Sequence, residues 1–143
     1  MRVFMNAERR ALAREFSSPR AGDAGYDLHA IEESAVAPLQ RVALRTGLHI
    51  EIPAGCVGLV KDRSSVASAG MHCLAGVIDS SYRGELKVLM VNLDSETALI
   101  KAGQKIAQLI VVPVLTEEIE LAARLEELSP SERGEGGFGS TGE

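Results

Sequence analysis

Short apolar segments separated by turn residues recur along most of this chain. Leu48–Ile52 alternates between apolar and polar side chains, and a Pro-Ala-Gly turn follows it. Two longer runs, Leu86–Leu93 and Ile106–Val114, are rich in apolar and β-branched residues and are also bounded by turn residues. Turns recur about every ten residues, a spacing typical of all-β sandwiches and barrels. Further short strands are expected at Arg2–Asn6, Tyr26–Ala30 and Cys56–Val60.

Two segments have helical character instead. Asn6–Glu15 contains good helix formers but few apolar positions. Glu117–Leu128 carries apolar residues close to the i, i+3, i+4 spacing of an amphipathic helix. In an all-β chain the same segment can equally be a last strand that leads into a linker, so both interpretations stay open.

The last eleven residues, Arg133–Glu143, differ in composition from the rest of the chain. Five of them are glycines, which lose the most backbone entropy on folding, so a flexible tail is expected. Its amides, the Ser140 and Thr141 hydroxyls and the Arg133 cation can surround phosphate oxygens. A purely solubilising tail is the alternative. Phe138 favours binding, because a ring among glycines has no apolar neighbours and can stack on a nucleobase.

Composition and charge exclude several classes of function. The net charge of −5 is unsuited to duplex nucleic acid, which needs clustered Lys and Arg, and no apolar run is long enough to cross a bilayer. Cys56 and Cys73 are the only cysteines, which argues against structural zinc and against a secreted disulfide framework. Glu8 and Glu15 interrupt an Arg-rich beginning that no apolar region follows. We therefore expect a cytoplasmic protein with no nucleic-acid or membrane partner.

The segment Gly76–Gly84 places an acid close to an aromatic ring. Asp79 follows an apolar stretch at once, and Tyr82 stands three residues later. Asp and Ser are ordinary turn residues, so a β-turn explains Asp79 but leaves Tyr82 unexplained. A carboxylate beside a ring can serve as a general base next to a flat packing surface.

Polar residues of other segments suit an anion or a metal. Arg63 offers a planar fork to phosphate, and Ser64 and Ser65 add hydroxyls and amides. One of these serines can equally cap a short helix, and the two interpretations are compatible because a helix N-terminus attracts anions. Asp27 suits a metal or a turn. Gln108 interrupts an otherwise apolar strand, where a polar side chain usually faces solvent.

Five of these segments, in this order, closely resemble the five motifs of the trimeric deoxyuridine triphosphatase (dUTPase) family. The resemblance covers nearly the whole chain, and five ordered motifs are far more specific than any one of them. The segments are AGYDL at Ala24–Leu28, RSS at Arg63–Ser65, GVIDSSYRG at Gly76–Gly84, GQKIAQLI at Gly103–Ile110 and RGEGGFGSTG at Arg133–Gly142.

The resemblance implies a jelly-roll-like β-barrel over residues 1–128 and a flexible arm over residues 129–143 that closes over the active site. It also implies a homotrimer with shared active sites that hydrolyses dUTP to dUMP and pyrophosphate with Mg²⁺. Asp79 is then the base that deprotonates the attacking water, and Asp27 reaches the metal through water. The implied substrate contacts are Arg63, Ser64, Ser65, Cys73, Gly76, Val77, Ile78, Asp79, Tyr82, Lys87, Gln108, Arg133, Phe138, Gly139, Ser140 and Thr141.

The chain departs from the family pattern at several positions. Asp62 stands before Arg63, where Gly or Pro is more usual, and Ser81 replaces a frequent second acid. Gln104 and Lys105 replace a common Asp-Arg pair. Some members carry an Asn in the base-reading arm near Cys73, and this chain has none, so uracil recognition is left to backbone groups.

Two other functions remain possible on the sequence. A dCTP deaminase of the same superfamily would need a base-proximal Glu suited to attack at C4, and no such motif is present. A jelly-roll module without chemistry is opposed by the presence of both Asp79 and Tyr82.

Overall fold

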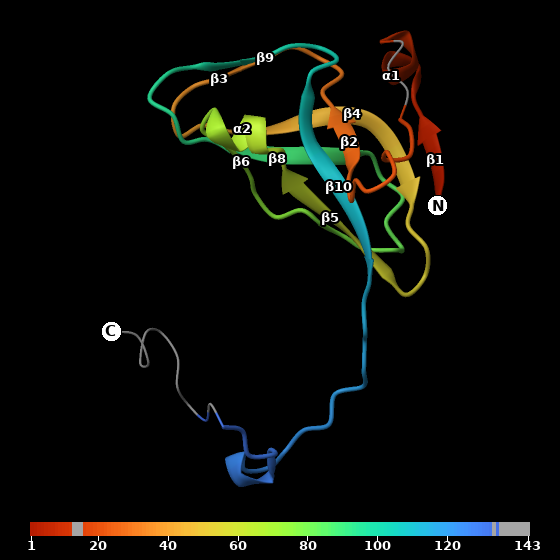
Figure 1. The fold of residues 1–143 in the computed structure, drawn as a ribbon, viewed down its shortest axis with the longest axis vertical. Helices are drawn as coiled ribbons and strands as arrows, with labels where there is room; N and C mark the ends of the chain where they lie inside the picture. Colours follow the sequence, from red (N-terminus) through yellow and green to blue (C-terminus); the bar gives the residue numbers. More distant parts are fainter. Residues whose placement is uncertain (13–15, 133, 135–143) are drawn as a thin grey trace.

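The computed structural model describes residues 1–12, 16–132 and 134. Its elements are antiparallel strands with two one-turn α-helices and a 3₁₀ turn (Figure 1). They are β1 (Arg2–Met5), α1 (Ala7–Ala11), β2 (Tyr26–His29), β3 (Ser34–Val36), β4 (Arg41–Glu51), β5 (Cys56–Asp62), α2 (Ser64–Ser68), β6 (Met71–Cys73), β7 (Val77–Ile78), β8 (Leu86–Asn92), β9 (Ala98–Ile100), β10 (Lys105–Pro113) and η1 (Leu125–Glu127).

The strands form two four-stranded sheets and one two-stranded ribbon. One sheet has the order β1-β4-β8-β6, the other the order β2-β10-β5-β7, and β3 pairs with β9. Neighbours in these sheets are far apart in sequence, as in a jelly roll. The all-β, jelly-roll-like fold expected from the sequence is confirmed. Strand pairing among the described residues does not close the sheets into a barrel.

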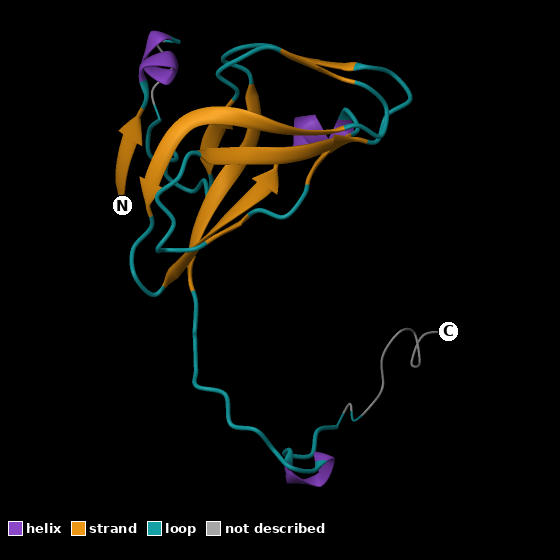
Figure 2. Ribbon diagram, turned by 180° about the vertical axis from the view of Figure 1, so that it is seen from behind, coloured by secondary structure: helices purple, strands orange, loops and turns teal. Residues whose placement is uncertain are grey.

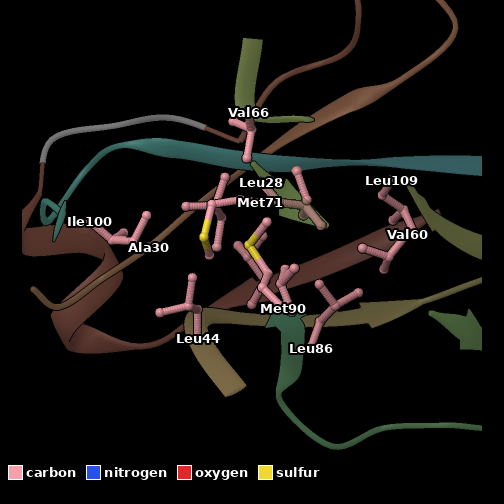
Figure 3. Close-up of a cluster of buried hydrophobic side chains, with 14 of the residues drawn as sticks. Leu28, Ala30, Leu44, Val60, Val66, Met71, Leu86, Met90, Ile100 and Leu109 are labelled. Carbon is pink, nitrogen blue, oxygen red and sulfur yellow. The ribbon is translucent and has the colours of Figure 1, made fainter. Parts of the chain in front are cut away.

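The core lies between the two four-stranded sheets and is almost entirely aliphatic. Along β8 the buried and less buried positions alternate, because successive side chains of a strand point to opposite faces. Val66 of α2 adds to the same cluster. Ten of the core residues are labelled in Figure 3: Leu28, Ala30, Leu44, Val60, Val66, Met71, Leu86, Met90, Ile100 and Leu109.

The longest strand, β4, extends well beyond the Leu48–Ile52 segment that alternation predicts. Its pairing with β8 shifts register between Arg45 and Leu48. Gly47 lies at this bulge with φ +66°, and a Cβ there would come within 2.7 Å of the Arg9 Cβ. The bulge breaks the period-two pattern, so the first half of the strand has no clear signal in the sequence.

Among the described residues, the two segments with helical character, Asn6–Glu15 and Glu117–Leu128, form only a short α-helix and a 3₁₀ turn. The first helix covers only Ala7–Ala11, and the Asn6 side chain caps it by accepting from the Arg9 backbone N–H at 2.8 Å. Glu117–Leu128 is neither a full helix nor a strand, since only η1 forms in it. Figures 1 and 2 show this segment running away from the sheets after β10. Its apolar side chains find no partner in the described part of the subunit, with Ile119 86% and Leu121 89% exposed.

A buried amide joins β8 to the β3–β9 ribbon. The Asn92 Nδ2 donates to the carbonyls of Val36 and Glu96, both at 2.8 Å, and its Oδ1 accepts from the Asp94 N–H at 2.9 Å. The side chain is fully buried. Removing it leaves the buried carbonyl of Val36 without this donor, whereas the bond to the Glu96 carbonyl is only partly buried.

Asn92→Ala should therefore lower the free energy of unfolding by about 1–3 kcal/mol, because a buried group left unsatisfied costs about that much. Urea denaturation at one fixed protein concentration measures it. Leu93→Ala, at the adjacent and exposed position, should change stability by less than about 1 kcal/mol. Equal losses for the two variants would contradict the role given to the amide.

Candidate active site

A cavity of about 1030 Å³ opens beside strands β2 and β10 and the start of α2. Its lining brings together residues from three of the five sequence motifs. These are Asp27, Arg63, Ser64, Ser65, Lys105 and Gln108. We call it the Asp27 cavity.

The register of β10 explains why these residues meet. In the ladder between β10 and β2, Gln108 is the partner of Asp27. In the ladder between β10 and β5, Ala107 is the partner of Asp62, the residue directly before Arg63. One strand therefore aligns motifs that lie about 35–80 residues apart in sequence.

Asp27 lies between two cations. Arg63 Nη1 bonds to its Oδ1, and Lys105 Nζ lies 2.7 Å from its Oδ2. Burial acts to raise the pKa of Asp27, but the hydrogen bond from Lys105 and the charges of Arg63, Lys105 and His29 outweigh it, so the pKa lies below its ordinary value. The carboxylate is thus ionised at neutral pH.

Gln108 lines the cavity rather than facing solvent on the outer side of the sheet. Its Nε2 donates to the Asp62 carbonyl at 2.9 Å, which fixes the amide plane. A Cβ at Gly25 would come within 2.3 Å of the Gln108 Oε1, so the glycine of the first motif makes room for this side chain.

The residues Arg63 to Ser65 form the beginning of α2. Arg63 is the capping residue in extended conformation, and the helix starts at Ser64. The expectation that a serine caps the helix is wrong, since neither serine precedes it. The two serines sit in the first turn, where backbone N–H groups have no partner inside a helix and can bind an anion.

Asp79 lies on a separate part of the subunit. It follows β7, which pairs with β5 through Gly58↔Ile78 and Leu59↔Val77. Arg63 is five residues beyond Gly58 along β5, which at a rise of 3.2–3.4 Å per residue is about 17 Å. Asp79 does not line the Asp27 cavity. The structure therefore does not bring the expected base to the expected phosphate contacts within one subunit.

The turn that carries Asp79 is internally fixed. The Tyr82 N–H donates to the Asp79 carbonyl at 3.1 Å, and the Tyr82 hydroxyl donates to the Glu85 carbonyl at 3.0 Å. Arg83 Nη1 donates to the carbonyls of Ser80 and Tyr82. The tyrosine ring lies over Gly84, where a Cβ would meet its hydroxyl at 2.2 Å. Asp79 and Tyr82 are both exposed at this turn.

The base-reading arm, residues 73–78, is not extended along its whole length. Ala75 and Gly76 have φ values of +55° and +94°, so the chain turns between β6 and β7. The Gly76 carbonyl accepts from the Val60 N–H at 2.8 Å and is already occupied. At the start of the arm, burial together with the hydrogen bond and charge of Asp62 raises the pKa of Cys73 to about 12, so the thiol stays neutral.

The remaining expected residues lie apart from these groups or outside the described residues. Lys87 is exposed on β8, at the register position opposite Arg45. The expected contacts of the C-terminal segment fall outside the described residues: Arg133, Phe138, Gly139, Ser140 and Thr141.

Several residues of the cavity lining were not expected as site residues from the sequence: Ser17, Ser18, Pro19, Arg20, Gly22, Asp23, His29 and Lys105. Lys105 stands in the sequence only as a departure from a motif, and its contact with Asp27 joins residues 78 positions apart. His29 lines the cavity two residues after Asp27, and its Nδ1 lies 3.1 Å from Nη2 of the buried Arg9. The period of two along β2 could have indicated His29, because positions i and i+2 share a face.

Comparison with known proteins decides the family. A family model described as dUTPase matches residues 13–142. The chain belongs to the dUTPase family. The dUTPase of Clostridium kluyveri, curated as deoxyuridine 5'-triphosphate nucleotidohydrolase, is 48% identical over 124 residues, which are 85% of each chain. The corresponding enzyme of Paramecium bursaria Chlorella virus 1 is 43% identical over 122 residues, 85% of this chain and 84% of its own.

Solved dUTPase structures share the fold. The Staphylococcus bacteriophage 80alpha dUTPase with dUPNHPP aligns with a TM-score of 0.84 and 30% identity, over 99% of this chain and 97% of its own. A mutant of the dUTPase from phage phi11 of S. aureus, described with a structural Mg(II) ion, has a TM-score of 0.79 and 27% identity, over 87% of this chain and 97% of its own. The dUTPase match favours an enzyme of dUTP hydrolysis over the deaminase and over a module without chemistry.

Replacing Lys105 tests the electrostatics of the Asp27 cavity. Lys105→Met should raise the pKa of Asp27, because its hydrogen bond to the carboxylate is lost. The ionised carboxylate stabilises the fold above its ordinary pKa of 3.8, and this contribution is lost as pH falls through the lowered folded-state value. In the variant the folded-state pKa lies closer to 3.8, so the contribution is smaller and is lost over a narrower interval of pH.

Carbon-detected NMR titration of the Asp27 carboxyl measures this pKa directly. Lys101→Met is the matched control, because Lys101 is exposed and is absent from the groups that shift Asp27. An unchanged titration of Asp27 in Lys105→Met would contradict the assignment.

Proposed function

We propose that this chain hydrolyses dUTP to dUMP and pyrophosphate at sites shared between the subunits of a homotrimer, with Asp79 as the general base. The observation that carries the proposal is the gathering of Asp27, Arg63, Ser64, Ser65 and Gln108 around one cavity. These side chains supply a guanidinium fork, hydroxyls and amide donors, a set suited to a triphosphate.

The α- and β-phosphates are assigned to Arg63, Ser64, Ser65 and Gln108. In the absence of substrate Asp27 holds Arg63 by an ion pair. A phosphate competes for the same guanidinium, and Lys105 keeps Asp27 neutralised when Arg63 changes partner. The donors stand ready where negative charge develops as pyrophosphate leaves.

The cavity also fits a magnesium ion held mainly by the substrate. Mg²⁺ usually keeps several waters and binds through one or two carboxylates together with phosphates. Asp27 provides one ionised carboxylate, and the described residues contain no group of three or more acidic, His or Cys side chains that could hold a metal unaided. We assign Asp27 to the waters of the ion. When bound, Mg²⁺ would neutralise charge on the phosphate oxygens.

Asp79 is assigned the proton of the water that attacks the α-phosphorus. Its turn is held by the Tyr82 N–H and by Arg83, which limits the freedom of the carboxylate. Tyr82 is assigned to pack on the deoxyribose and to exclude a 2′-hydroxyl. Backbone groups of the base-reading arm, with Cys73, Gly76, Val77 and Ile78, are assigned to the uracil edge, where a mismatched base leaves buried polar groups unpaired. Lys87 is kept as a substrate contact on the resemblance alone.

A site shared between subunits is supported by the absence of Asp79 from the lining of the Asp27 cavity, since β7, which precedes Asp79, pairs with β5 near Gly58 and not near Arg63. A triphosphate held by Arg63 needs an Asp79 close to its α-phosphorus, which another copy of the chain can supply. Exposed apolar side chains provide surface for assembly, including Val77 in the arm and Leu115 after β10, which are 66% and 83% exposed. Three copies around one axis give three equivalent sites.

The C-terminal segment completes the proposal from its sequence. Arg133, Gly139, Ser140 and Thr141 are assigned to the γ-phosphate, and Phe138 to the uracil face. The support is their chemistry and the family match, which extends to residue 142. On this assignment residues 1–128 form the catalytic body and residues 129–143 the arm that closes over the site.

We also propose a cytoplasmic location, which Cys56 and Cys73 support as free thiols. Within the part of the chain that the structure describes, no helix combines the length and apolar character that a membrane crossing requires.

Asp79→Asn should abolish pyrophosphate release from dUTP while leaving binding of non-hydrolysable dUpNHpp nearly unchanged. The amide keeps the shape of the side chain but cannot take a proton, so the loss belongs in kcat. General base catalysis is typically worth about 10²–10⁴ in rate. Ser81→Ala, in the same turn, should remain active. Turnover of Asp79→Asn within about tenfold of wild type would remove Asp79 from the role of base.

Mixing two inactive variants tests the shared site. Asp79→Asn and Arg63→Ala each lack one half of the catalytic set, so each homotrimer should be inactive. Co-expressed at equal levels, they should form mixed trimers in which one of the three sites takes both intact halves from different chains.

Isolation through two different affinity tags, followed by the pyrophosphate assay, measures the recovered activity. Sedimentation of the wild type checks that the assembly has three times the mass of the 15.2 kDa chain. A mixture as inactive as its parents would place each site within one subunit.

A further inference from the structure

Asp62 contacts several other segments of the proposed site. It is the last residue of β5 and directly precedes Arg63. Its Oδ1 accepts from the Cys73 backbone N–H at 2.7 Å, and its Oδ2 lies 2.6 Å from Nδ1 of His72. Its own carbonyl accepts from Gln108 at 2.9 Å. Asp62 thus precedes the residues Arg63–Ser65, which we call the phosphate turn, and contacts both the base-reading arm and β10.

The carboxylate bridges the two four-stranded sheets. Strand β5 belongs to the sheet β2-β10-β5-β7, whereas β6, with His72 and Cys73, is the edge strand of the other sheet. An edge strand exposes N–H groups that no neighbouring strand accepts from. Asp62 provides the acceptor for one of these groups, and thereby fixes where the arm leaves β6.

The ionisation of Asp62 agrees with its contacts to Cys73 and His72. Burial acts to raise the pKa of Asp62, but hydrogen bonds from Cys73 and His72 outweigh it and hold the pKa below its ordinary value. An ionised carboxylate only accepts, so Nδ1 of His72 carries the proton of their bond. The contact is therefore charge-assisted, and such bonds are shorter and stronger than neutral ones.

We propose that Asp62 is a specificity-determining positioning residue whose carboxylate holds the start of the base-reading arm, through Cys73 and His72, in the register that selects uracil. The inference rests on the proposed function, which assigns that arm to the base. Asp62 acts through the arm and does not touch the substrate. The turn that carries Asp79 depends on its own hydrogen bonds and on the pairing of β7 with β5. Loss of Asp62 should therefore impair base selection more than turnover.

The test compares kcat/KM for dUTP and dCTP in wild type and variants. Asp62→Ala should lower the ratio of the two kcat/KM values about tenfold, mainly through KM for dUTP, with kcat for dUTP within about threefold of wild type. Asp62→Asn should restore the ratio to within about threefold, because its Oδ1 still accepts from the Cys73 N–H. Glu33→Gln, at an exposed position, is the matched control for loss of a carboxylate.

His72→Ala provides a second test should Asp62→Ala fail to fold. His72 is on the exposed side of β6, and its removal deletes one of the two contacts of the carboxylate. It should lower the dUTP preference by about threefold at unchanged melting temperature. A dUTP preference equal to wild type in the soluble Asp62→Ala variant, or in His72→Ala if the former does not fold, overturns the inference.

An Asp62→Asn variant as unselective as Asp62→Ala also overturns it, because the hydrogen bond would then not be the cause. The proposed function fails by a different result: a wild-type protein that releases no pyrophosphate from dUTP.

Discussion

Strand β10 pairs with β2 on one side and with β5 on the other, and the remaining site geometry depends on these two ladders. Their register puts Gln108 opposite Asp27 and places Ala107 beside Asp62. A shift of one residue would turn Gln108 to the other face of the sheet and separate Asp27 from Arg63. The apolar residues around Gln108 oppose such a shift, since Ala107 and Leu109 are fully buried. Packing of the core thus fixes the positions of the polar residues.

The charges in the Asp27 cavity are paired before any substrate is present. Asp27 forms an ion pair with both Arg63 and Lys105, so neither cation lies isolated in a partly buried place. An entering phosphate must therefore displace a carboxylate, and the net gain is smaller than the bare charges suggest. On the proposed function, this exchange favours ligands with several phosphates, because Ser64, Ser65 and Gln108 are assigned as donors to the further phosphate groups. A monophosphate product has fewer contacts with which to offset the same exchange.

The motifs allowed the family, the β-rich fold and five residues of the cavity to be predicted from the sequence: Asp27, Arg63, Ser64, Ser65 and Gln108. Contacts that depend on register could not be predicted, as the ion pair between Lys105 and Asp27 shows. The same limit hid the first half of β4, where the Gly47 bulge interrupts the alternation. The pattern of Glu117–Leu128 is ambiguous for another reason. Its apolar residues have no partner in the described part of the subunit, so intrinsic preference alone does not produce a helix or a strand.

Asp62 indicates how a departure from a family pattern can be understood physically. A glycine at this position could not join β5 to β6, whereas the aspartate accepts from the edge of the second sheet. The chain thereby fixes its base-reading arm from outside the arm, although the arm has no Asn of its own. On the shared-site proposal, the base-reading arm and the phosphate turn of one subunit belong to different sites. Asp62 directly precedes the phosphate turn in the chain and is hydrogen-bonded to the arm. A distortion of either segment then changes the geometry of two sites of the trimer. On this proposal the Asp62 carboxylate affects a site beyond its own subunit.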